Sequence, residues 1–315
     1  MPNPLIIDCH LHMYESQDLA LWEKANYEIW EYGDKAEVHS GRFAGDVGDA
    51  LKALSQAGAA KAVAVNLFGL SPARQQAIAE LPEGLTPTEE RREIERIDEG
   101  MGDRLKSFNE WACGVAKEHP EFVPFIAADP WVLPVEEMCD HIVDQVRHGG
   151  AKGIKLHGII QQVHMSDRRM WPIYQTCVEE GLSIIAHSGP ARGPDQYAEP
   201  RAFADVLKAF PDLVLVLAHL GGGAWGQIRE CADAFPQAYF DCSEILAWTG
   251  GTKAPSNLEL ARLIKEIGPH RVMMGSDFPW YDVDYSADWV MSLPVLSQSE
   301  KEGIVGANAE RILRL

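Results

Sequence analysis

The sequence LIIDCHLH at residues 5–12 places two histidines directly after a short apolar run. The apolar run predicts a buried β-strand close to the N-terminus. Side chains alternate between the faces of a strand, so His10 and His12 should point the same way, with Asp8 on that face too. Two imidazoles about 7 Å apart on one face can converge on a single metal ion. Taken alone, so short a motif is more often a pair of hydrogen-bonded structural histidines.

Further apolar segments alternate with helical patterns along the rest of the chain. The predicted strands lie at residues 61–67, 122–127, 151–157, 182–187, 213–219, 238–242 and 271–277. With the first strand they make eight, and strands that alternate with helices predict a parallel sheet with right-handed crossovers. Eight nearly continuous apolar strands favour an α/β fold of the closed (β/α)₈ type, a TIM barrel, over a doubly wound open sheet.

Two segments depart from this alternation. Residues 13–47 are aromatic and acidic and predict a long loop that carries a helix. Residues 69–102 contain three prolines and a mixed charge cluster, so we expect an irregular stretch, with the cluster on a solvated helix face and a regular helix only from Asp103. We therefore predict one domain over residues 1–315, with both segments as excursions over the C-terminal mouth of the barrel.

Composition narrows the class of protein. The 28 basic and 47 acidic residues give a net charge of −19, which disfavours nucleic acid and anionic membranes as partners. The six cysteines are scattered and predict reduced thiols rather than a disulfide framework. No apolar run approaches the roughly 20 residues that span a bilayer, and the N-terminus lacks a secretory pattern. We expect a soluble cytoplasmic protein with a small-molecule substrate, and its apolar loop residues would allow a homodimer.

Side chains that can bind a metal ion or take part in catalysis lie at the C-terminal ends of five predicted strands. These residues are His10, His12, Lys155, His157, His187, His219 and Asp277. In an eight-stranded α/β barrel the C-terminal strand ends meet at one mouth, where catalytic groups lie. Each histidine alone is more often structural, but their shared position at five strand ends favours a metal site.

Five motifs in these positions resemble those of the amidohydrolase superfamily. They are DCHLH at 8–12, GIKLH at 153–157, IAHSG at 185–189, LAHLGG at 217–222 and GSDFP at 275–279. In detail they are similar to its amidohydrolase-2 branch, which includes aminocarboxymuconate-semialdehyde decarboxylase and many hydrolases. The resemblance extends over nearly the whole chain.

The resemblance implies one divalent metal ion, usually Zn²⁺, bound by His10, His12, His187 and Asp277. It makes His219 a catalytic side chain beside the metal rather than a ligand. Imidazoles with one carboxylate suit zinc and leave an open position for water, although Mn²⁺ or Fe²⁺ could occupy the same site.

Lys155 leaves the number of metal ions open. In two-metal members of the superfamily a carboxylated lysine on strand four bridges the ions, and His187 and His219 bind the second. The amidohydrolase-2 branch is generally mononuclear, so we expect one ion, with an uncarboxylated Lys155 in contact with the substrate. His157 shares the strand face of Lys155, where it either lines the pocket or caps its rim.

Three further residues are expected to contact the substrate. Trp225 and Trp280 lie one turn past motif residues and predict walls of the pocket. Arg192 follows the fifth strand and could bind a carboxylate, although an arginine in a loop is more often simply solvated.

The leading functional hypothesis is a metal-dependent hydrolase that opens a lactone, ester or amide of a small organic acid. A metal-activated water would attack, Asp277 would accept the water proton, and His219 would stabilise or protonate the developing charge. The alternative is a metal-dependent non-oxidative decarboxylase, or a hydratase, for an aromatic or muconate-type acid. A metal-binding protein without catalysis is disfavoured because no member of the catalytic set is missing.

Overall fold

The eight strands form one sheet in which each strand pairs with the next in parallel. The computed structural model describes residues 4–32, 41–190, 196–249 and 254–315. The strands are β1 (Ile7–Leu11), β2 (Lys61–Val65), β3 (Phe122–Ala127), β4 (Gly153–Leu156), β5 (Ser183–Ala186), β6 (Val214–Leu217), β7 (Ala238–Asp241) and β8 (Val272–Met273). Backbone hydrogen bonds join β1 to the segment after β8, including Cys9 N–H to Met274 O at 3.0 Å. The predicted (β/α)₈ barrel is confirmed.

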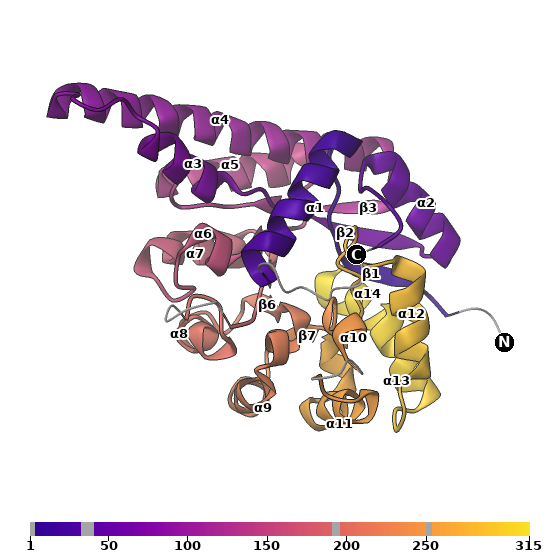
Figure 1. The fold of residues 1–315 in the computed structure, drawn as a ribbon. Helices are drawn as coiled ribbons and strands as arrows, with labels where there is room; N and C mark the ends of the chain where they lie inside the picture. Colours follow the sequence, from indigo (N-terminus) through magenta and orange to yellow (C-terminus); the bar gives the residue numbers. More distant parts are fainter. Residues whose placement is uncertain (1–3, 33–40, 191–195, 250–253) are drawn as a thin grey trace.

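Helices connect the strands and surround the sheet (Figure 1). The N-terminal ones are α1 (Gln17–Tyr32), α2 (Val47–Ala57), α3 (Leu70–Ala79), α4 (Pro87–Glu118), α5 (Val135–Asp144), α6 (Gly158–Gln161) and α7 (Trp171–Glu179). The C-terminal ones are α8 (Ala204–Ala209), α9 (Trp225–Ala234), α10 (Ile245–Trp248), α11 (Asn257–Ile267), α12 (Val283–Ser292), α13 (Gln298–Glu302) and α14 (Asn308–Leu313). Within the described ranges, no helix is both long and apolar enough to cross a bilayer.

The expectation of an irregular stretch at residues 69–102 is wrong. Helix α3 occupies its first part, and α4 begins at Pro87 rather than at Asp103. Thr86 caps α4 in a reciprocal pair with Glu89, and Pro87 occupies the first turn, where a proline loses no helical hydrogen bond. The prolines therefore mark helix ends. Residues 89–92 are exposed on α4, which confirms the solvated helix face, and Figure 1 shows the first turns of α4 extending past the barrel.

The barrel interior is packed below the mouth by apolar side chains from successive strands, such as Val63, Phe125 and Ile185. Gly153 on β4 permits this packing. A Cβ atom at Gly153 would lie 2.3 Å from Phe125 Cε2 and 2.4 Å from the backbone oxygen of Ser183. The missing side chain thus lets β4 approach its neighbours at the level just below Lys155.

Gly153→Ala should lower the free energy of unfolding by roughly 1–3 kcal/mol or more, because the added methyl group overpacks the barrel interior. Gly114→Ala is the matched control, since a Cβ there meets nothing within 4 Å. It lies inside α4 and should stabilise the protein by about 0.5–1 kcal/mol. Urea unfolding of both variants measures the difference. Equal effects would show that the interior at β4 is loosely packed.

Candidate metal centre

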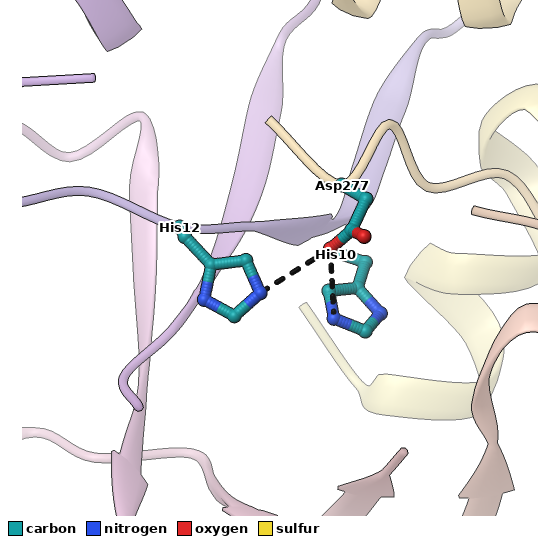
Figure 2. A group of neighbouring side chains, drawn as sticks. All are labelled: His10, His12 and Asp277. Atoms are coloured by element: carbon teal, nitrogen blue, oxygen red, sulfur yellow. Dashed lines mark ion pairs between the residues drawn. The ribbon is translucent and has the colours of Figure 1, made fainter. Parts of the chain in front are cut away.

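Two histidines and one carboxylate converge at the mouth of the barrel (Figure 2). Asp277 Oδ1 lies 3.5 Å from His10 Nε2 and 3.3 Å from His12 Nε2. Ligand atoms about 2.0–2.1 Å from a tetrahedral zinc ion lie about 3.3 Å from one another, so these separations fit such an ion. All three side chains are largely removed from solvent. The donor set and its geometry are therefore suited to a divalent metal.

The closure of the barrel brings Asp277 to the histidines. Its backbone N–H donates to His10 O at 2.8 Å, and Phe278 forms an isolated parallel bridge with Leu11. Asp277 has a φ of 64°, and His219 and Glu244 have φ values of 57° and 59°. Such left-handed backbone is uncommon outside glycine and concentrates at functional sites.

Asp241 is a site residue that the sequence analysis missed. Its Oδ2 lies 3.0 Å from His10 Nδ1, and its Oδ1 accepts hydrogen bonds from His219 N–H at 3.0 Å and Ser243 Oγ at 2.6 Å. Asp241 stands at the C-terminal end of β7, the position that marks the other candidates, and this signal could have identified it. The carboxylate places the proton of His10 on Nδ1 and leaves the Nε2 lone pair for a metal.

The protonation states agree with this arrangement. Burial, assisted by the charge of Lys155, lowers the pKa of His10 to about 3, so the imidazole is neutral, as a metal ligand must be. Burial alone would raise the pKa of Asp241, but the contact with His10 outweighs it and holds that pKa well below its usual range. Lys155 Nζ lies 2.7 Å from His10 Nε2, and Lys155 is 1% exposed. A metal ion bound to Nε2 would therefore replace the hydrogen bond from Lys155.

The remaining histidines form a row of neighbouring rings. His157 stacks on His187 with ring centroids 3.8 Å apart, and His187 lies 4.8 Å from His219, which lies 5.0 Å from His10. Burial lowers the pKa of both His157 and His187 well below the usual range. The structure thus brings His187 beside the centre. Among the described residues, however, the groups of closest donor atoms do not include it.

The residues predicted to contact the substrate differ in where the structure places them. The ring of His157 accepts a hydrogen bond from the backbone of Ile160 and so caps α6, one of the two roles considered for it. Trp280 lies edge-on to His12 with centroids 5.2 Å apart. Trp225 begins α9 and is 9% exposed. Arg192 lies outside the described residues.

A carboxylate also accompanies His219. Glu244, directly after β7, places Oε2 3.7 Å from His219 Nδ1. The donor atoms of His219, Glu244 and Asp277 all lie within 4.8 Å of one another. A histidine between two carboxylates can hold and transfer a proton.

Comparison with known families agrees with the geometry. The sequence profile described as Amidohydrolase, of the amidohydrolase-2 type, matches residues 7–315. The chain belongs to the amidohydrolase family. No curated protein matches this amidohydrolase in sequence.

Solved structures share the fold of this amidohydrolase over nearly its full length. A 5-carboxyvanillate decarboxylase from Sphingomonas paucimobilis is 15% identical, with a TM-score of 0.66 over 99% of this chain and 100% of its own. A 4-oxalomesaconate hydratase from Rhodopseudomonas palustris is 17% identical, with a TM-score of 0.61 over 98% and 96%. A dihydroxybenzoic acid decarboxylase from a Polaromonas species, solved with manganese, is 16% identical, with a TM-score of 0.66 over 100% and 98%.

Asp241→Asn should weaken zinc binding about 10- to 100-fold, because the amide does not hold His10 in the required tautomer as the carboxylate does. Equilibrium dialysis against a chelator of known affinity measures the change. Asp205→Asn, at an exposed aspartate of α8, is the matched control and should bind zinc normally. Unchanged zinc affinity in a folded Asp241→Asn protein would show that this carboxylate does not orient the ligand.

Proposed function

We propose that this amidohydrolase is a metal-dependent, non-oxidative decarboxylase of a small hydroxylated organic acid. The observation that carries the proposal is Lys155, an almost fully buried ammonium group 2.7 Å from the metal-facing nitrogen of His10. A buried cation beside a metal centre is suited to a substrate carboxylate. The surface of the chain, with a net charge of −19, offers such a substrate no general attraction.

This proposal reverses the order of the two hypotheses drawn from the sequence. The sequence analysis favoured a hydrolase and kept decarboxylase or hydratase as the alternative. Family membership supports metal-dependent chemistry in general, whereas the similar structures named above are two decarboxylases and a hydratase. Together with Lys155, these likenesses support the alternative better than hydrolysis.

The residues present fit a single divalent ion held by His10, His12 and Asp277, with His187 as the fourth ligand expected from the sequence. When bound, the ion supplies a Lewis acid that polarises substrate oxygens. The Polaromonas decarboxylase holds manganese, so we propose Zn²⁺ or Mn²⁺ for this chain.

The surrounding side chains have complementary roles in this proposal. Lys155 binds and orients the carboxylate that leaves as CO₂. The bond between this carboxylate and the adjacent substrate carbon breaks, and a proton delivered by His219, with Glu244 Oε2 3.7 Å from its Nδ1, takes the place of the carboxylate on that carbon. Trp280, packed edge-on against His12, restricts water at the reacting carbon.

Purified protein should contain about one divalent ion per chain by elemental analysis, because the three candidate donor groups among the described residues each share a residue with the other two. His10→Ala should lose most of this metal. His148→Ala, at an exposed histidine of the outer surface, should retain it. Two ions per chain, with a carboxylated Lys155, would instead support the two-metal arrangement.

Isotope labelling should separate the reactions. Hydroxybenzoates and carboxymuconate-type acids, tested in deuterium oxide, should release CO₂ and gain deuterium at the vacated carbon, without uptake of solvent oxygen-18. Turnover of aryl lactones or esters with oxygen-18 in the product carboxylate would overturn the proposal in favour of hydrolysis. Oxygen-18 uptake at carbon without CO₂ release would indicate a hydratase.

Lys155→Met should reduce kcat/KM for these acids by about 100-fold or more, which corresponds to loss of a charge-assisted contact of about 3 kcal/mol. Lys152→Met removes an exposed lysine three residues earlier and should have no effect. Metal content measured on both variants shows whether a loss of activity arises at the substrate or at the metal. Full activity of Lys155→Met would remove the main support for a carboxylate substrate.

A further inference from the structure

Two buried polar atoms on segments that border the metal centre have no hydrogen-bond partner in the described part of the chain. They are the hydroxyl oxygen of Tyr14, which is 1% exposed, and Oε2 of Glu23, which is 4% exposed. A buried polar group without a partner costs about 1–3 kcal/mol, so native proteins contain few of them. Two such atoms beside a candidate active site are best explained by a ligand that supplies their partners.

Tyr14 belongs to the strand end that carries the metal ligands. It is the second residue after His12, and its backbone N–H donates to Gly45 O at 3.0 Å. Its ring lies edge-on to Phe68, just past β2, with centroids 6.2 Å apart. Burial raises the pKa of Tyr14, and the charges of Glu23 and Asp277 raise it further, so both carboxylates influence the hydroxyl electrostatically.

Glu23 is held near the same place by its neighbour in α1. The backbone oxygen of Lys24 accepts a hydrogen bond from Trp280 Nε1 at 3.1 Å, and Lys24 Nζ donates to Gly41 O at 3.1 Å. Trp280 in turn packs edge-on against His12. Helix α1, which crosses the barrel in Figure 1, is thereby fixed to the wall of the metal centre. Glu23 therefore lies on a helix that is anchored to the wall of the metal centre.

We propose that Tyr14 and Glu23 form a specificity subsite that binds a hydroxyl group of the substrate. A hydroxyl can donate to the Glu23 carboxyl group and accept from the Tyr14 hydroxyl, so one ligand group satisfies both atoms. The inference deepens the proposed function by selecting hydroxylated acids over otherwise identical acids. A site built to bind a hydroxyl discriminates strongly against an analogue that lacks it, because its own polar groups then stay unpaired.

The protonation of Glu23 suits this role. Burial raises the pKa of Glu23 to about 7, against an opposing effect of the charge of Arg104. A carboxyl group that is neutral for part of the time can donate as well as accept a hydrogen bond. It also adds less negative charge beside an incoming acid than an ordinary glutamate would.

The test is calorimetric binding to the zinc-loaded protein, which requires no turnover. The probes are salicylate and the four dihydroxybenzoates that carry one extra hydroxyl at ring position 3, 4, 5 or 6. The wild-type protein should bind at least one dihydroxybenzoate about 10-fold or more tightly than salicylate. Tyr14→Phe and Glu23→Gln should each reduce this ratio, the affinity for the best dihydroxybenzoate divided by that for salicylate, to about 3-fold or less without weakening the binding of salicylate.

Controls separate recognition from folding. Asp18→Asn removes an exposed carboxylate from the same helix and should preserve the ratio. Urea unfolding should show Tyr14→Phe and Glu23→Gln to be at least as stable as the wild type, since the first removes an unpaired hydroxyl and the second removes a carboxyl charge that burial disfavours. A purely structural role would instead lower stability and leave the ratio unchanged.

The outcomes also distinguish this inference from the proposed function. A ratio that depends on Tyr14 and Glu23, without CO₂ release from any acid, would support the subsite and refute decarboxylation. CO₂ release with an unaltered ratio in both variants would refute the subsite alone. Equal wild-type affinity for all five probes, or no binding of any, would also overturn it, because the two atoms would then be satisfied by water.

Discussion

The contact between Asp241 and His10 is the interaction on which the rest of the site depends. It crosses the barrel interior from β7 to β1, and both side chains are completely buried. A buried carboxylate is stable only when its oxygens are well paired, and Asp241 also accepts from the backbone of His219 and from Ser243. One charged group thus orients the proposed metal ligand and the proposed proton donor together.

The contacts that close the barrel also assemble the site. The backbone hydrogen bond from Asp277 to His10 joins the segment after β8 to β1 and also sets the carboxylate beside the imidazoles. The left-handed backbone of His219, Glu244 and Asp277 lies at three adjacent strand ends. Such conformations persist only where surrounding structure holds them, so the rigid barrel below supports the strain at its mouth.

The sequence predicted those features of the fold that a local pattern of residues encodes. The strand Phe122–Ala127 matches its predicted bounds because a continuous apolar run marks it. Residues 69–102 were misinterpreted because prolines at helix ends resemble prolines in loops. Asp241 stands at a strand end like the other candidates, but its pairing with His10 spans 231 positions, so its role beside His10 leaves no local signal. The strand ends identified the site, whereas its internal contacts required the three-dimensional structure.

Lys155 connects metal binding to substrate binding. Its ammonium group now donates to the nitrogen of His10 that a metal ion would take. Metal binding would end that hydrogen bond, and a substrate carboxylate bound beside the metal would accept from the ammonium group in its place. An acid would therefore bind more tightly to the metal-loaded protein than to the metal-free one, beyond any direct contact with the ion. Because acidic residues outnumber basic ones in the chain, this short-range exchange has to provide the selectivity for an anion that the protein surface does not provide.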